Sequence, residues 1–240
     1  ARAAEANLAS GSTRVGLSGA TLDLTTTGDR ARVSLAATFG DLVSPGISGE
    51  AVGVTLNGEA PYPDLDERRS AGDLDLTATL SAGRLESGST SGRGLDARVT
   101  LDGRVNGWLE SFTLTGETEG GLSADALVMG DANASGSRLS FSETGLDVSR
   151  RDGRVQWRLD GPMTLATARV RSGELTLTGL DLRSDAVSAG GRSGEGQATA
   201  FEITAPTSVR GRSLDFGDLH LSGVSGRLEA DVTGDGVVLA

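Results

Sequence analysis

Apolar and polar residues alternate along most of the chain. In residues 31–39 every second side chain is apolar, and residues 95–101 and 122–128 repeat the pattern. Side chains on a β-strand point alternately to opposite faces of the sheet, so each run predicts a strand with one apolar and one polar face. Helical periodicity is absent, with one helical turn expected at most, at residues 65–70. The sequence therefore predicts an all-β fold.

Turn signals separate these runs. Asp-Gly and Asn-Gly pairs accept the positive φ angle of tight hairpin turns. They recur at hairpin spacing and predict many short strands that pair antiparallel in a long meander. The expected turns are Gly28-Asp29, Asn57-Gly58, Asp102-Gly103, Asp152-Gly153 and Gly234-Asp235-Gly236.

The pattern also bears on the organisation of the chain. A loose repeat, apolar-x-apolar-x-Gly followed by another apolar pair, occurs in residues 175–182 and 219–224 without a fixed length, which argues against the regular coils of a solenoid. Residues 60–72, with two prolines and a charge cluster, and residues 188–197, rich in Gly and Ser, are expected to be long hairpin loops. No shift in composition marks a boundary, so residues 1–240 are predicted to form a single elongated β domain.

The predicted apolar faces are aliphatic. Aromatic residues make up only 3% of the chain, and the repeating apolar positions are mostly Leu, Val and Ala. A sheet with a continuous apolar face must hide it by packing on a second sheet, closing into a barrel or curling around a ligand. An aliphatic face suits a partner that is itself aliphatic. The residues expected to line such a surface are Leu22, Leu24, Val33, Leu35, Val54, Leu56, Leu74, Leu76, Leu80, Val99, Leu101, Leu114, Val128, Leu159, Leu175, Leu177, Leu219 and Leu221.

The sequence offers no catalytic centre. Without cysteine, the chain can form no disulfide, thiolate metal site or cysteine nucleophile. The single histidine, His220, lies between two leucines and is expected on the polar face, where a lone histidine predicts neither a metal site nor a Ser-His-Asp triad. Trp108 and Trp157 are assigned to core packing, with a position in an interface or groove as the alternative. No catalytic residue, metal ligand or cofactor is predicted, and the protein is not expected to be an enzyme.

The charge of the chain narrows its partners further. Acidic residues outnumber basic ones by 33 to 22, which gives a formal net charge of −11. A negative chain without a basic patch is a poor ligand for nucleic acids, whose affinity comes mainly from phosphate neutralisation. Carboxylates spaced i, i+2 occur in the geometry of Ca²⁺ or glycosidase sites, but here they are interpreted as the solvated outer face of strands. They are Asp64 and Asp66, Asp73 and Asp75, and Glu117 and Glu119.

One pattern in the sequence is shared with a known family. Residues 175–183 and 219–236 alternate leucine with polar residues and break the alternation with glycine, in the form L-x-L-x-G-L-x-G-x-L punctuated by Asp-Gly turns. Residues 19–56 have the same pattern. In this pattern, which extends over nearly the whole chain, the protein resembles the AsmA-like, TamB-like and YdbH-like bacterial envelope proteins.

The resemblance implies a fold and a function. Such proteins form a long, twisted, largely antiparallel sheet curled into a U-shaped groove, anchored in the inner membrane and crossing the periplasm of Gram-negative bacteria. The groove is expected to act as a lipid-transfer bridge that carries phospholipid acyl chains between the inner and outer membranes. The TamB-like branch is also linked to outer-membrane protein assembly. Because the chain starts at Ala1 and has no apolar anchor segment, we expect it to be part of a longer protein whose anchors lie outside it.

Other interpretations of the same pattern remain open at this point. A β-solenoid or β-sandwich with a closed, dry core would favour a structural or adhesive protein, such as a filament subunit. A β-helix with carboxylates, arginines and aromatics in one cleft would favour a polysaccharide-cleaving enzyme. The shape of the sheet distinguishes these alternatives.

Overall fold

The protein folds as one antiparallel β-sheet. The computed structural model describes residues 2–3, 6–10, 13–44, 46–62, 64–108, 110–194 and 197–238. Eleven strands, β3 to β13, are 15 to 20 residues long. The strands are β1 (Arg2–Ala3), β2 (Ala6–Ser10), β3 (Thr13–Thr27), β4 (Arg30–Ser44), β5 (Ile47–Pro61), β6 (Ser70–Ser87), β7 (Thr90–Trp108), β8 (Ser111–Met129), β9 (Ala132–Arg151), β10 (Arg154–Ser172), β11 (Leu175–Gly194), β12 (Gln197–Phe216) and β13 (Leu219–Val238).

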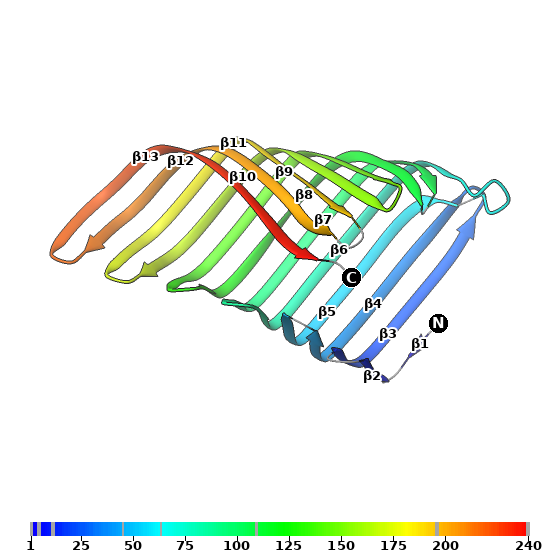
Figure 1. The fold of residues 1–240 in the computed structure, drawn as a ribbon, viewed down its shortest axis with the longest axis horizontal. Helices are drawn as coiled ribbons and strands as arrows, with labels where there is room; N and C mark the ends of the chain where they lie inside the picture. Colours follow the sequence, from blue (N-terminus) through cyan, green and yellow to red (C-terminus); the bar gives the residue numbers. More distant parts are fainter. Residues whose placement is uncertain are drawn as a thin grey trace.

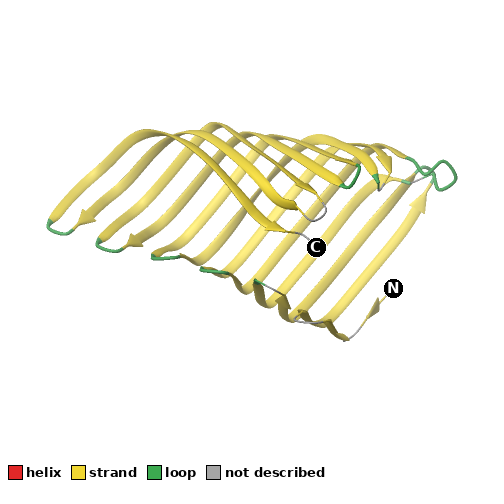
Figure 2. Ribbon diagram, in the orientation of Figure 1, coloured by secondary structure: helices red, strands yellow, loops and turns green. Residues whose placement is uncertain are grey.

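The strands pair in the order of the sequence. From β3 to β13 each strand lies between its two neighbours in the chain, and the short strands β1 and β2 both pair with β3. Within the described residues β13 pairs only with β12, so the sheet keeps two free edges and does not close into a barrel. Figure 2 shows strands and turns only. The predicted all-β, antiparallel meander is therefore confirmed.

The sheet is strongly curled. In Figure 1 the strands β3 to β5 run nearly straight, whereas the far halves of the C-terminal strands turn back over the sheet. No second sheet packs against the first in the described part of the chain, because all strands belong to one sheet. The shape agrees with the predicted curled groove and differs from a sandwich or a solenoid.

Register shifts explain why the C-terminal half curls more. β9 carries one extra residue against both of its neighbours near Glu143, whose φ is 49°. β11 likewise has one extra residue relative to both of its neighbours, β10 and β12, between Arg183 and Ser188. A bulge bends the strand that carries it and increases the local twist. The pairings from β4 to β7 have no such shift, and these strands stay straighter.

Three of the five predicted turns lie inside strands. Gly28-Asp29 and Asp152-Gly153 do form turns, but Asn57-Gly58, Asp102-Gly103 and residues 234–236 belong to β5, β7 and β13. The strands are therefore longer than predicted. Two of these glycines are needed for close contact between strands, because a Cβ on Gly58 would lie 2.0 Å from the Asp75 carbonyl oxygen and one on Gly103 would lie 2.5 Å from that of Thr115.

The two predicted loops are also shorter than expected. Between β5 and β6 the described residues form turns without a helix, closed by paired backbone hydrogen bonds between Asp64 and Arg69 of 2.7 and 3.0 Å. Residues 188–194 form part of β11 instead of a loop, a correction to the sequence-based prediction. Their glycine content has a packing reason, since a Cβ on Gly191 would lie 2.7 Å from the Trp157 ring in β10.

A line of left-handed residues crosses the sheet. It consists of Ala51, Gly94, Gly136, Gly179 and Gly223, whose φ angles lie between 51° and 66°; we name it the corner line. Its members lie in every second strand from β5 to β13 and recur at intervals of 42 to 44 residues, which is the length of one hairpin. The loose repeat at residues 175–182 and 219–224 thus belongs to a spacing that varies only between 42 and 44 residues. In the last four hairpins the corner residue follows a turn glycine by six residues, and these turn glycines are Gly88, Gly130, Gly173 and Gly217.

The corner line keeps the apolar residues on one face. In β11 the apolar positions are 175 and 177 before Gly179 but 180 and 182 after it. Leu177 pairs with Val170, and Leu182 pairs with Leu165, so the alternation changes step in both strands at this level. Both sets still share one face at the corners of β5 and β7, since a Cβ on Gly49 would lie 2.9 Å from the Val52 side chain and one on Gly92 would lie 3.1 Å from that of Leu95. A strict alternation would have sent one set to the other face. The left-handed residue lies where the alternation changes step, without the register shift of a β-bulge, and the repeat apolar-x-apolar-x-Gly is its signature in β11 and β13.

Ion pairs connect neighbouring strands on the polar face. Arg32 Nη2 in β4 donates to Glu59 Oε1 in β5 at 2.5 Å, and Arg30 Nε donates to Glu59 Oε2 at 3.2 Å. The hydrogen bond and charge of Arg32, aided by Arg30, hold the pKa of Glu59 below its ordinary value. This contribution to stability is present above the ordinary glutamate pKa and is lost as the pH falls through the lowered one, and solvent keeps it small.

Arg32→Ala is expected to raise the pKa of Glu59 towards its ordinary value, because the largest cause of the shift is removed. Carbon-13 NMR titration of the side-chain carboxyls measures this change. Arg98→Ala, on the polar face of β7, is the control and should leave the pKa of Glu59 where it is. An unchanged value in Arg32→Ala would mean that Arg30 alone keeps the carboxylate ionised.

Candidate apolar groove

The candidate functional site is the apolar face of the sheet. An aliphatic row crosses it from β3 to β12, and each residue of the row lies directly opposite the next. Side chains directly opposite one another have Cβ atoms about 4.5–5.5 Å apart, so the row leaves no polar gap. Its residues are Ala20, Ala37, Val54, Leu80, Ala97, Leu122, Leu139, Leu165, Leu182 and Val209.

The apolar face is the shielded side of the sheet. Among the described residues, every fully buried side chain lies on this face by register and alternation. Side chains shield one another on a concave surface, so the apolar face lines the inside of the curl. The buried apolar residues are Ala31, Val52, Leu74, Ala82, Ala124 and Val187.

In the part of the chain that the structure describes, no second layer covers the rest of the apolar face. The accessible surface of the chain is 15160 Å² for a mass of 24.4 kDa. A compact protein of this mass exposes about 10,000 Å². The residues of the aliphatic row are half-buried. The total accessible surface includes both faces of the sheet, and an accessible aliphatic row on one of them is typical of a site that takes a ligand or a partner.

All of the predicted groove residues except Val128 share the apolar face. Val128 lies opposite Ser91 and Asn133, on the polar face, and Leu127 takes the apolar position instead. The prediction for Val128 is wrong because the alternation of apolar and polar positions in β8 changes at Asp125. This residue lies beside Gly94 of the corner line, and beyond it the odd-numbered residues of β8 take the apolar face. Counting every second residue across that point assigns the wrong face.

Exposure of the predicted groove residues is greatest at the two edges of the sheet. Leu22 and Leu24 in β3 and Leu219 and Leu221 in β13 are exposed by 44 to 59%. Val99, in the middle of the sheet, is exposed by 36%. The face is thus accessible in its centre as well as at its ends.

Aromatic side chains on this face cover glycines of the neighbouring strand. A Cβ on Gly234 would lie 2.6 Å from the Phe201 ring, and Trp157 covers Gly191 in the same way. Each ring fills the space that the missing side chain would take. Trp157, predicted in a core, is therefore a half-buried part of the groove wall, and the half-buried Trp108 ends β7.

Two of the buried threonines on the apolar face are satisfied within the sheet, whereas the buried Ser184 Oγ has no hydrogen-bond partner among the described residues. Thr118 Oγ1 donates to the Thr100 carbonyl at 2.7 Å, and Thr144 Oγ1 donates to the Ser142 carbonyl at 3.2 Å. A hydroxyl with a partner of this kind adds little polarity to an apolar wall. The sequence pattern missed these wall residues because a threonine at an apolar position interrupts the alternation.

Most charged residues of the described strands lie on the polar face, and Arg150, opposite Phe112 and Val155 near the end of β9, is an exception. His220 is opposite Asp215, and its Nδ1 contacts that carboxylate. Arg104 Nε donates to Asp73 at 2.9 Å, so Asp73 is a partner in a surface ion pair. The residues that the structure describes contain no group of three His, Asp or Glu side chains that could hold a metal ion.

Comparisons of the chain with protein-family models, with curated proteins and with solved structures find no match. No helix long and apolar enough to cross a membrane occurs in the described part of the chain. The geometry of the sheet is therefore the basis for its function.

Proposed function

We propose that the chain is a segment of a lipid-transfer bridge that carries phospholipid acyl chains along its apolar face. The observation that supports this most directly is the aliphatic row from Ala20 to Val209, which continues from strand to strand without a polar gap. The row lies on the shielded side of the curl, and no second layer covers it in the described part of the chain. Ten strands about 4.8 Å apart make a wall roughly 45 Å long.

The proposed mechanism is passive. Transfer of an acyl chain from water to such a wall gains about 0.8 kcal/mol for each CH₂ that is fully desolvated. Successive positions along the row are alike in chemistry, so the chain can move from one to the next without losing much of this gain. The lipid headgroup stays at the open side of the groove, in water, and no single residue is needed to hold the lipid.

The proposed setting is an aqueous compartment between two membranes. By the resemblance, this compartment is the periplasm, and the partners are the inner and outer membranes together with their phospholipids. The inner-membrane anchor would lie outside these 240 residues. A nucleic acid is not expected as a partner, because the net charge is −11.

Lipid extraction from the purified chain, followed by mass spectrometry, tests the proposal. Phospholipid should co-purify, and a phospholipid brominated on its acyl chains should quench the fluorescence of Trp157 in a Trp108→Phe variant. The same lipid without bromine is the control. A lipid-free chain whose Trp157 is not quenched would contradict the proposal, and assembly into filaments would then support the structural alternative.

A further inference from the structure

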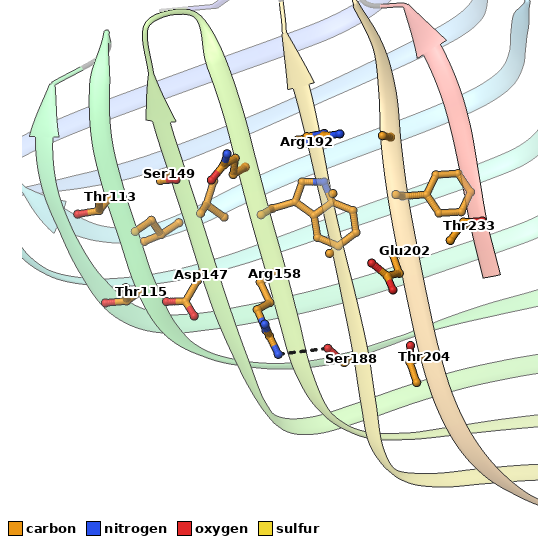
Figure 3. A pocket seen from close by; sticks show the side chains of 18 of the residues that line it. Thr113, Thr115, Asp147, Ser149, Arg158, Ser188, Arg192, Glu202, Thr204 and Thr233 are labelled. Atoms are coloured by element: carbon orange, nitrogen blue, oxygen red, sulfur yellow. Dashed lines mark hydrogen bonds between the residues drawn. The ribbon is translucent and has the colours of Figure 1, made fainter. Parts of the chain in front are cut away.

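A second concave site lies on the opposite side of the sheet from the groove. It is a hollow of about 1030 Å³ formed by β8 to β13 (Figure 3). Its volume is at the upper end of the roughly 300–1,000 Å³ that is usual for small-molecule sites. Two adjacent rows of the polar face line it, one through Asp147, Arg158 and Glu202 and the other through Gln156 and Arg192.

The register separates this hollow from the groove. Asp147, Arg158 and Glu202 alternate along their strands with residues of the apolar face. The aromatic residues of these strands, Trp157 and Phe201, cover glycines on the apolar face and are also among the residues that line the hollow. The hollow is thus lined mainly by polar and charged residues, and Leu114, Val148, Trp157 and Phe201 of the apolar row between them also belong to its lining.

A glycine leaves the middle of the hollow open. Gly190 lies between Arg158 and Glu202 in one row. A Cβ on Gly190 would meet its nearest neighbour, the Trp157 carbonyl oxygen, at 3.4 Å, which is an ordinary contact. The space over Gly190 is therefore free, and a ligand there would have charged side chains on both sides.

The charged groups around Gly190 differ in how they are held. Arg158 Nε donates to Asp160 at 2.5 Å, and its Nη2 donates to Ser188 Oγ at 3.4 Å (Figure 3). The hydrogen bond and charge of Asp160 raise the pKa of Arg158, which stays charged. Arg192 and Glu202 are different, because within the described residues neither makes a side-chain hydrogen bond or an ion pair.

We propose that this hollow binds a small zwitterion, in which a phosphate or carboxylate is joined to an ammonium group by a short linker. Arg192 and Gln156 lie directly opposite each other and offer donors to the anionic group. Glu202 lies diagonally from Arg192 across β11 and β12, a position about 7–8 Å away at Cα, and accepts from the ammonium group. Because Asp160 already pairs with Arg158, the charges left for a ligand on β11 and β12 are Arg192 and Glu202, one of each sign, which favours a ligand that carries both charges.

Titration of the whole chain with phosphoethanolamine, followed by amide NMR shifts, tests this proposal. Saturable shifts in β11 and β12 are expected, with a dissociation constant of about 1 mM for a ligand of this size. Inorganic phosphate and ethanolamine should each bind at least tenfold more weakly. γ-Aminobutyrate shows whether a carboxylate replaces the phosphate. Absence of saturable shifts with both zwitterions, or equal binding of phosphate alone, would overturn the proposal.

Two variants locate the binding in the hollow. Gly190→Leu fills the free space, and Arg192→Gln removes the anion contact, so each should weaken phosphoethanolamine at least tenfold. Gly145→Leu is the matched control, because Gly145 is a polar-face glycine in β9 outside the hollow whose Cβ would lie 3.6 Å from the Asp160 carbonyl oxygen. Circular dichroism checks the fold of all three. Normal binding by folded Gly190→Leu or Arg192→Gln would place the ligand elsewhere.

Discussion

Val99→Asp is expected to lower the phospholipid retained by the purified chain at least about tenfold, with little change in the free energy of unfolding. Val99 is 36% exposed in the middle of the apolar face, so water can solvate an aspartate there in the lipid-free protein. A bound acyl chain would have to dehydrate the carboxylate, and a charge in hydrocarbon costs about 2.5–3.5 kcal/mol. Each 1.4 kcal/mol is a factor of about ten in affinity. Mass spectrometry of extracted lipid and urea unfolding measure the two quantities.

Val128→Asp is the matched control for this prediction. Val128 is also a valine in a central strand, but it lies on the polar face opposite Ser91 and Asn133. An aspartate at Val128 should leave lipid retention unchanged, whereas Leu177→Asp, on the apolar face of β11, should behave like Val99→Asp. Equal losses of lipid in Val99→Asp and Val128→Asp would contradict the apolar face as the lipid path. If Val99→Asp lowers the free energy of unfolding but retains as much lipid as the parent chain, Val99 is a core residue and not part of the lipid path.

The second large effect is expected at the corner line. Gly136→Val should lower the free energy of unfolding by about 2 kcal/mol or more, because a left-handed backbone costs a residue with a Cβ about 1–2 kcal/mol. Gly136 has φ 60°, and its added Cβ would also lie 3.1 Å from the Ala168 Cβ. Ala51→Gly, at φ 51° on the same line, should stabilise by up to about 1 kcal/mol. Urea unfolding measures both variants.

Gly226→Val provides the comparison for the corner line. Gly226 lies in β13 opposite Val209, outside the left-handed region, and a Cβ there would have no atom within 4 Å. Its substitution should change the free energy of unfolding by about 0.5 kcal/mol or less. If Gly136→Val unfolds like the parent chain, or if Ala51→Gly is less stable, the corner line does not depend on left-handed backbone.

The all-β fold and the apolar face could be predicted because they depend on local alternation. The run from Ala31 to Phe39 places its apolar residues on one face in the sequence pattern and in β4 alike. The antiparallel order also followed from the sequence, since hairpin turns connect neighbouring strands. The curled outline agrees with the family resemblance, whereas periodicity alone left the sandwich and the solenoid open.

The lengths of the strands could not be predicted because they depend on contacts between strands. Asn57-Gly58 and Asp102-Gly103 have the local chemistry of hairpin turns. In the sheet, Gly58 and Gly103 instead admit the backbone of the adjacent strand, a requirement set by residues such as Asp75 and Thr115 far along the chain. The dipeptide alone does not reveal whether its glycine serves a hairpin turn or a close contact with the adjacent strand.

Parts of the apolar groove and of the polar hollow could not be predicted from the sequence either. The assignment of Val128 failed because the step in the alternation depends on where the corner line crosses β8. The polar hollow was not anticipated, because Arg192 and Glu202 are ten residues apart in the chain and meet only through the pairing of β11 with β12. Residues 188–194, which had the composition of a loop, supply Gly190 at its centre.

The corner line also limits how such a sheet can change in length during evolution. Its left-handed residue recurs once per hairpin of 42 to 44 residues, always in strands that run in the same direction. Duplication or deletion of one whole hairpin would keep the corner and the aliphatic row aligned and would alter the wall by two strand widths, about 10 Å. Insertion of a single residue between a corner and its turn would instead rotate that half-strand and move its leucines into water.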